Sequence, residues 1–270
     1  TKLLLEAGAD PNIQNGNGDT PLHYSDSPEI IKLLLEAGAN PNIQNKRGST
    51  TLHWSCNRNN YEITKLLLEA GADPNIQNND GNIYLHYSDS PEITKLLLEA
   101  GADPNIQDYG GDTPLHWVKS PEITKLLLEA GANPNIQNND GNIYLHWSCN
   151  RNNYEITKLL LEAGANPNIQ NKRGSTPLHY SDSPEITKLL LEAGADPNIQ
   201  NNDGSTPLHN SRSPETTKLL LEAGADPNIQ NNLGSTTLHY SDSPEITKLL
   251  LNYNSFTDLN DLMLISSNIN

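Results

Sequence analysis

The chain is built almost entirely from one repeated unit. All eight histidines follow a leucine at one position of this unit, and all 18 prolines fall at three positions. A fixed period of this kind predicts a solenoid, in which each unit packs only against its neighbours. The string Glu-Ala-Gly-Ala marks the period, because its successive copies start 30 or 33 residues apart, at Glu6, Glu36, Glu69, Glu99, Glu129, Glu162, Glu192 and Glu222.

The second half of each unit has the pattern of an amphipathic helix. In the unit over residues 15–44, Ile30, Leu33, Leu34 and Ala37 recur at helical spacing. Residues at this spacing share one face of a helix, so we expect the four side chains to face the core.

The ends of the two helices of a unit are also marked. Asp26 or Ser27 can cap the second helix, Pro28 suits its first turn, and Gly38 is expected to end it in a left-handed conformation. The Thr-Pro-Leu-His segment that starts at Thr20 begins a shorter first helix. Asn-x-x-Gly, just before that segment, predicts the tip of a turn.

These segments together resemble the ankyrin repeat. Thr-Pro-Leu-His followed by Glu-Ile-x-Lys-Leu-Leu-Leu-x-x-Gly-Ala is similar to the family's signature. The resemblance implies an all-α fold, an ankyrin-repeat solenoid of helix-turn-helix units with β-turn fingers. We expect the array to span residues 1–251, with a partial first unit, and residues 252–270 to form a C-terminal capping helix and tail.

The units have two lengths. Six of the eight have five residues between the histidine and the glutamate that opens the second helix, whereas the units of His53 and His146 have eight, as the family does. Three missing residues shorten the first helix by about 4.5 Å. The sequence therefore predicts a shallow concave wall from which residues 54–60 and 147–153 project.

The composition excludes several classes of protein. Only 34% of the residues are apolar, and the longest apolar run has four residues, which is too short to span a membrane. The net charge of −16 disfavours binding to nucleic acid or to an anionic membrane surface. Cys56 and Cys149 are too few for a disulfide framework or a metal site, and too far apart in a solenoid to bond. We expect no cofactor. We expect a reducing, intracellular location, in the cytoplasm of the protein's own cell or of a host cell.

A catalytic role is also disfavoured. The string His-Tyr-Ser-Asp-Ser holds the residue types of a nucleophile and a base, but it occurs at four places. Adjacent helical residues do not converge as a Ser-His-Asp triad must. In the ankyrin family this histidine is a structural hydrogen-bonding residue, which fits all eight copies. We therefore expect no enzymatic activity.

The position after the histidine is aromatic in seven units, and Asn210 is the exception. This column either packs neighbouring repeats together or offers a partly exposed stripe of binding anchors. Its members are Tyr24, Trp54, Tyr87, Trp117, Trp147, Tyr180 and Tyr240.

The finger tips vary more than the helices, and ankyrin proteins typically bind partners through the tips and the first-helix surface. The basic tips are suited to acidic partner side chains, although drift among duplicated units would produce the same variation. The candidate partner-binding residues at the tips are Lys46, Arg47, Asn79, Asp80, Tyr109, Asn139, Asp140, Lys172, Arg173, Asn202, Asp203 and Leu233.

Further candidates lie on the first helix, where several basic residues are expected to place positive charge on the concave side. Two of them replace Asp26 of an earlier unit at intervals of 93 residues. Duplication of a three-repeat block would explain that spacing without selection for binding. These candidates are Arg58, Trp117, Lys119, Arg151 and Arg212.

The leading hypothesis is a non-catalytic scaffold that binds a partner protein through its concave face and finger tips. The alternatives are a structural protein whose units stack end to end, and a substrate adaptor whose effector domain lies outside this chain. We expect a monomer, with end-to-end self-association as the alternative. Heavy use of Asn and Ile is typical of AT-rich genomes, and the resemblance extends to duplicated ankyrin arrays of large DNA viruses and intracellular bacteria.

Overall fold

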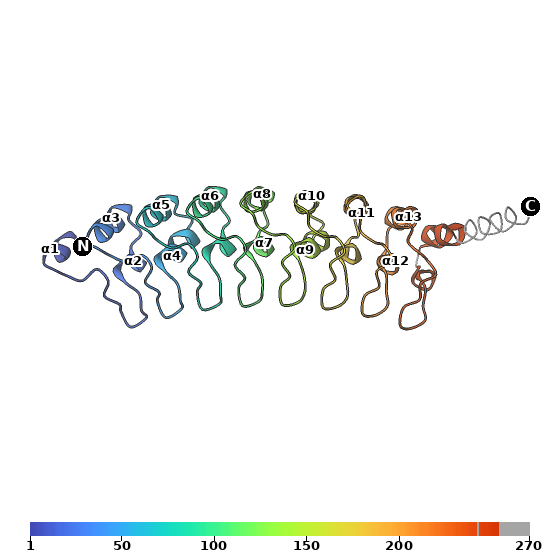
Figure 1. The fold of residues 1–270 in the computed structure, drawn as a ribbon, viewed down its shortest axis with the longest axis horizontal. Helices are drawn as coiled ribbons and strands as arrows, with labels where there is room; N and C mark the ends of the chain where they lie inside the picture. The colour runs from blue at the N-terminus through green and yellow to red at the C-terminus, as the bar shows by residue number, and fades with distance from the viewer. Residues whose placement is uncertain (242, 254–270) are drawn as a thin grey trace, which may run out of the picture. The chain divides into compact units, whose positions relative to one another are not determined.

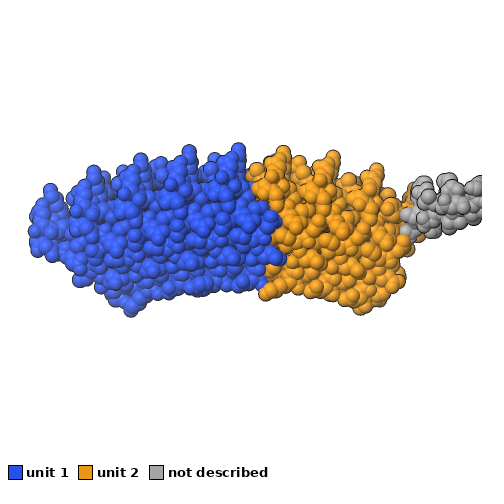
Figure 2. Space-filling model, viewed as in Figure 1, with its two compact units in different colours: residues 1–139 blue, residues 140–270 orange. Residues whose placement is uncertain are grey.

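The structure, a computed structural model, describes residues 1–241 and 243–253. The chain divides into two compact units, Thr1–Asn139 and Asp140–Asn270 (Figure 2). Within each unit, short helices alternate with finger-like loops, and the described residues contain no β-strand (Figure 1). The all-α prediction is therefore confirmed.

Each repeat contributes a short helix, here called helix A, and a longer helix B. In the first unit the helices A are α2 (Pro21–Tyr24), α4 (Thr51–Asn57), the 3₁₀ turn η1 (Tyr84–Tyr87) and α7 (Pro114–Trp117). The helices B of that unit are α1 (Lys2–Glu6), α3 (Pro28–Glu36), α5 (Tyr61–Glu69), α6 (Pro91–Glu99) and α8 (Pro121–Glu129).

The second unit follows the same order. Its helices A are α9 (Tyr144–Asn150), η2 (Pro177–Tyr180), α12 (Pro207–Asn210) and η3 (Thr237–Tyr240). Its helices B are α10 (Tyr154–Glu162), α11 (Pro184–Glu192) and α13 (Pro214–Glu222), and residues 244–253 are helical too. Residues 254–270, the remainder of the predicted capping helix and tail, lie outside the described residues.

Local signals fix both ends of helix B. The hydroxyl of Ser27, not the carboxylate of Asp26, caps α3 by accepting a hydrogen bond from the Ile30 N–H at 3.4 Å. Gly38 ends the helix with φ +87°, and the next N–H, of Ala39, donates to the Leu34 carbonyl at 2.9 Å. This is the left-handed ending that the sequence predicts.

The buried face of helix B matches the predicted stripe only in part. Of the four residues predicted in α3, only Leu34 is buried, whereas Ile30 is 36% exposed and Ala37 lies just beyond the last helical residue. The isoleucine itself is buried in five other repeats, at Ile63, Ile93, Ile123, Ile156 and Ile186. The next position along the helix is buried as well. It is Ile31 in α3 and a fully buried threonine in six other repeats, namely Thr64, Thr94, Thr124, Thr157, Thr187 and Thr217.

Hydrogen bonds explain how a polar residue occupies this core position. The Thr94 hydroxyl donates to the Ser90 carbonyl one turn earlier at 2.8 Å and lies 2.7 Å from the Ser88 hydroxyl. A buried hydroxyl with partners carries little penalty, while its methyl group packs as an apolar group does. The predicted stripe was incomplete, because a hydrophobicity pattern counts threonine as polar.

Histidine and asparagine side chains join each repeat to the next. The Thr20 N–H donates to Nδ1 of His23 at 3.1 Å, so the proton lies on Nε2, which bonds to the Ser49 carbonyl of the following repeat at 3.1 Å. The same tether recurs in both units, for example from His53 and from His146. The predicted structural role of this histidine is therefore confirmed.

An asparagine clamp lies at the opposite end of each repeat. Nδ2 of Asn12 donates to the Gly38 carbonyl at 3.1 Å, and its Oδ1 accepts from the Asn40 N–H at 2.7 Å. In the next repeat Nδ2 of Asn42 donates to the Gly71 carbonyl at 3.0 Å. The same contact therefore spans 26 residues in a short unit and 29 residues in a long unit.

The two repeat lengths differ in helix A, as predicted. This helix has four residues in a short unit such as α2, and seven in α4 and α9. The three extra residues add almost one turn. Asn59 and Asn152, each with φ +53°, then end the long helices in the left-handed conformation that asparagine tolerates best after glycine.

One substitution is expected to have opposite effects at two equivalent positions of helix A. Thr51 and Tyr84 occupy the first helical position, where four other repeats carry proline. The buried Thr51 hydroxyl has no hydrogen-bond partner among the described residues, and the residue before it has the extended backbone that proline requires. Thr51→Pro should therefore stabilise the fold by about 1 kcal/mol in urea denaturation.

Tyr84→Pro is the matched control. The Tyr84 side chain is buried, and its hydroxyl donates to the Cys56 carbonyl at 2.6 Å. Removing it leaves a cavity and takes one of its hydrogen bonds from the Cys56 carbonyl, which keeps the bond from the Asn59 N–H, so a loss of about 2 kcal/mol is expected. Equal effects of the two substitutions would contradict this account of the position.

Candidate functional site

The fingers form a hydrogen-bonded row within each unit. Gly48 closes the turn of its finger with φ +73°, and the Asn79 N–H of the next finger donates to the Arg47 carbonyl at 3.0 Å. In the second unit the Lys172 N–H donates to the Asp140 carbonyl at 2.9 Å. Bonded backbones hold neighbouring tips at a fixed separation.

The twelve residues predicted at the tips are all exposed. Tyr109 is 73% exposed and Leu233 is 82% exposed. The asparagines serve the row itself, because Nδ2 of Asn79 donates to the Lys46 carbonyl at 2.8 Å, and Asn139 and Asn202 make the equivalent bond. The charged and apolar tip residues are the ones left to face solvent.

The aromatic column lies beside the fingers and is half-exposed in most repeats. Several of the rings pack on a neighbour. Tyr87 and Trp117 meet edge to face with ring centroids 6.0 Å apart, and His146 and Tyr180 do so at the same distance. The packing interpretation therefore holds for these rings, and their partial exposure leaves a binding role as a prediction.

The long helices A add a stacked arginine to this surface. The guanidinium of Arg58 lies 5.6 Å from the centroid of the Trp54 ring, and Arg151 lies 5.6 Å from Trp147. Arg58 also pairs with the carboxylate of Asp26. Its charge is therefore balanced locally, which the sequence did not indicate.

The predicted projection of residues 54–60 is right only in part. Asn57, Arg58 and Asn59 are exposed, whereas Ser55 and Cys56 are buried between helices A and B. They are buried because α4 continues its helical turn, which directs every third or fourth side chain inward. Burial raises the pKa of the Cys56 thiol to about 12, so this cysteine is not a nucleophile at neutral pH.

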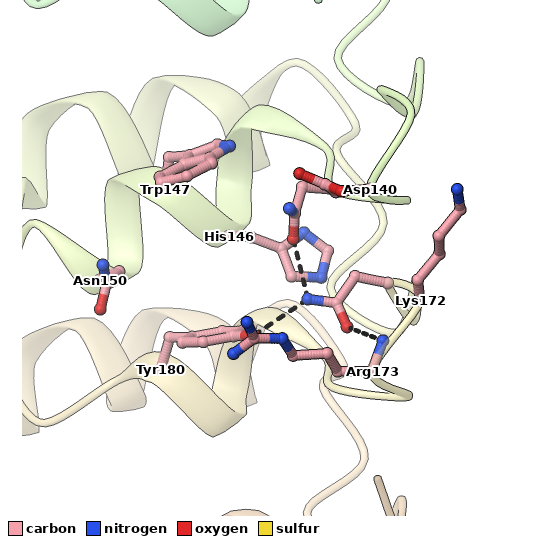
Figure 3. Close-up of a pocket in the computed structure, with 9 residues that line it drawn as sticks. Asp140, His146, Trp147, Asn150, Lys172, Arg173 and Tyr180 are labelled. Atoms are coloured by element: carbon pink, nitrogen blue, oxygen red, sulfur yellow. Dashed lines mark hydrogen bonds between the residues drawn. The ribbon is translucent and has the colours of Figure 1, made fainter. Parts of the chain in front are cut away.

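A hollow of about 330 Å³ follows the long helix A of the second unit (Figure 3). We call it the unit-2 hollow. Asn171 organises its wall, because Nδ2 donates to Oδ1 of Asn142 at 2.8 Å and to the Tyr180 hydroxyl at 3.0 Å, while Oδ1 accepts from the Arg173 N–H at 2.9 Å. Its lining residues are Asp140, Asn142, His146, Trp147, Asn150, Asn171, Lys172, Arg173 and Tyr180.

An equivalent hollow of about 300 Å³ follows the long helix A of the first unit. This unit-1 hollow has the same histidine, tryptophan and asparagine on its helix side. It is lined by Arg47, Ser49, His53, Trp54, Asn57, Asn78, Asp80, Tyr84 and Tyr87. A further hollow of about 330 Å³ lies on the other flank of the Lys46–Arg47 finger and includes Tyr24 and Arg58.

The comparisons with known proteins agree with this geometry. A sequence profile for ankyrin repeats in three copies matches residues 1–78, 24–108, 116–201 and 180–261. The chain belongs to the ankyrin-repeat family. A comparison with curated proteins found no match.

A solved ankyrin structure is similar over most of this array. It is the crystal structure of the ankyrin repeat domain of Bcl-3, described as a unique member of the IkappaB protein family. The two sequences are 29% identical, and the match has a TM-score of 0.68 over 76% of this chain and 99% of that chain. Ankyrin repeats are a non-catalytic interaction fold, so the array is a protein-interaction domain.

The array's cations divide into two groups. Most lysines of helix B form surface ion pairs with a glutamate one turn later, as Lys188 does with Glu192 at 3.8 Å. Among the described residues, no carboxylate pairs with Lys46, Arg47, Lys172 or Arg173. The predicted residues Lys119, Arg151 and Arg212 are exposed and likewise form no ion pair within the described ranges.

Two further findings limit the chemistry of the ankyrin array. No three His, Cys, Asp or Glu side chains of the described residues are grouped so that they could hold a metal ion. No helix in the described part of the chain is long and apolar enough to cross a membrane.

Sequence reasoning missed two kinds of residue that shape the site. Tyr84 and Tyr144 stand where other repeats have proline, and both are buried. Tyr84 lies beside the long helix α4, and Tyr144 lies in the first turn of the long helix α9. Asn78 and Asn171 build the walls of the two hollows. The signal for the tyrosines was the string Asn-Ile-Tyr-Leu-His, which departs from Thr-Pro-Leu-His in two units.

Proposed function

We propose that the chain is a non-catalytic scaffold that binds a partner protein through its concave face and finger tips. The observation that carries the proposal is the hollow between neighbouring fingers in each unit, which has a half-buried tryptophan and a partly exposed tyrosine beside charged tips. Aromatic and arginine side chains at a partly enclosed surface are the usual energetic centres of protein interfaces.

The contacts within the site favour a rigid binding surface. Finger backbones are bonded to one another, and asparagine side chains hold the walls. A preorganised surface loses little conformational freedom on binding, so its contacts contribute to affinity more fully. The proposed contact residues are the exposed tip residues named above, together with Trp117, Lys119, Arg151 and Arg212.

Affinity capture from a eukaryotic cell lysate, with quantitative mass spectrometry, tests this proposal. The wild-type chain is compared with K46E/R47E/K172E/R173E, which reverses the charge of two finger tips. The control K95E/K125E/K188E/K218E has the same change of net charge on the exposed side of helix B. We expect a partner that the wild type and the control retain, and that the finger variant loses by about tenfold or more.

Two outcomes would contradict the proposal. Equal loss with both variants would show that net charge, and not the finger surface, governs capture. Recovery of the bait's own chain alone, with a mass in light scattering that rises with concentration, would favour end-to-end self-association instead.

A further inference from the structure

The unit-1 and unit-2 hollows are two versions of one site with different rims. His146, Trp147 and Asn150 stand where His53, Trp54 and Asn57 stand in the first unit, and Tyr180 matches Tyr87. The upstream finger contributes Arg47 to the unit-1 hollow but Asp140 to the unit-2 hollow. The downstream finger contributes Asp80 to the first and Lys172 with Arg173 to the second.

The rim of the unit-2 hollow carries a local excess of positive charge on a chain whose net charge is −16. Lys172 and Arg173 form no ion pair within the described part of the chain, whereas Lys158, Lys188 and Lys218 of the same unit are all paired. In the view of Figure 3 the Arg173 side chain extends from its finger toward the hollow, and Asp140 stands on the opposite finger.

The charge of the lining suits an acidic side chain. The guanidinium of an arginine binds a carboxylate through two parallel hydrogen bonds. In a partly enclosed hollow, water weakens the attraction between the two charges less than it does in open solvent. The partly exposed ring of Trp147, which lines the hollow, offers contact area for the backbone of an extended segment. Asp140 repels a second carboxylate, which orients a single acidic side chain toward Arg173.

We propose that the unit-2 hollow binds an aspartate or glutamate side chain of an extended acidic segment of the partner protein, with Arg173 and Lys172 as the residues that determine this specificity. The inference rests on the proposed function, since it names the chemistry of the bound segment. The unit-1 hollow, with Asn79 and Asp80 at the equivalent tip, lacks this preference.

The experiment uses a display library of unbiased linear peptides selected against the full chain. An enriched peptide is then titrated against the chain in a Trp54→Phe/Trp117→Phe background, in which Trp147 is the remaining tryptophan and reports from the wall of the hollow. We expect the enriched peptides to be rich in Asp and Glu, and binding to change the Trp147 emission.

Charge exchange between the two hollows provides the matched variants. K172N/R173D gives the unit-2 finger the Asn-Asp tip that the chain already carries at residues 79–80 and 202–203, so the fold tolerates it. We expect this variant to bind the acidic peptide about tenfold or more weakly. K188N/K218D makes the same change of charge on α11 and α13 and should leave the affinity unchanged. N79K/D80R should create a second site, which Trp54 reports in a Trp117→Phe/Trp147→Phe background.

Each contrary result has its own meaning. Peptides without acidic enrichment, a silent Trp147, or equal losses in K172N/R173D and K188N/K218D overturn the assignment of the hollow while the scaffold function stands. If neither the library nor the lysate gives any binder, the proposed function fails as well, and the inference falls with it.

Discussion

Lowering the pH from 7 to 5 is expected to destabilise the array by several kcal/mol, because its buried histidines take up protons on unfolding. Burial lowers the pKa of His146 from 6.5 to about 4. It also lowers the pKa of His53, His86, His179 and His209. Between pH 6.5 and the folded pKa, the unfolded chain binds more protons than the folded chain, so stability is full above pH 6.5 and falls below it. His146 alone contributes a loss of roughly 2 kcal/mol at pH 5.

Urea denaturation followed by circular dichroism at pH 7, 6 and 5 measures this loss. His146→Gln removes one titrating group, so it should be less stable at pH 7 and lose roughly 2 kcal/mol less between pH 7 and 5. Leu98→Ala, which lowers stability without removing a histidine, should keep the full pH dependence. Carboxylates take up protons at lower pH than these measurements cover, as for Glu92, whose pKa the Ser90 hydroxyl lowers below 4.5. An unfolding free energy that stays flat from pH 7 to 5 would contradict the histidine account.

Leu97→Ala is expected to lower the free energy of unfolding by about 4 kcal/mol. Leu97 is the middle residue of the Leu-Leu-Leu string in α6 and has no exposed surface, whereas Leu96 and Leu98 are half-buried. Truncating a fully enclosed leucine removes its buried apolar area and also leaves a cavity, because the flanking repeats are held in place by their tethers. The urea midpoint at pH 7 gives the measured loss.

Leu96→Ala and Leu98→Ala are the matched controls for that cavity. The same number of atoms is removed, but the vacated space is open to water on one side. Their expected loss is about 1–2 kcal/mol each. Equal losses at the three positions would mean that the repeat collapses around the cavity. The enclosed leucine would then contribute no more to the free energy of unfolding than its half-buried neighbours.

The sequence predicted those features that depend on a few neighbouring residues. Ser27 caps helix B, Gly38 ends it, and Asn-x-x-Gly forms the finger turns, because each signal acts through its own backbone. It did not identify Thr94 as a core residue, since the hydroxyl partners that permit burial lie in the turn before the helix. The predicted stripe includes Leu34, the counterpart of Leu97, but it gives the same weight to Leu33, which is half-buried.

The residues of the candidate site were also predicted only in part. Exposure of Lys172 and Arg173 follows from their place at a turn tip, and the sequence predicts it. The pairing of Arg58 with Asp26 was missed, because the two residues belong to different repeats and meet only when the repeats stack. The hollows were missed for the same reason, since each is enclosed by two fingers and one helix.

The asparagine clamp has a consequence for how such a chain changes in length. The bond from Asn12 to Gly38 and the bond from Asn42 to Gly71 are the same contact, although the second encloses three more residues. All three extra residues lie in helix A, and the hydrogen bonds to the neighbouring repeats are the same in both units. Insertions in helix A therefore leave the hydrogen bonds between neighbouring repeats unchanged. An array can lengthen helix A at a single binding hollow while all other repeats keep their register.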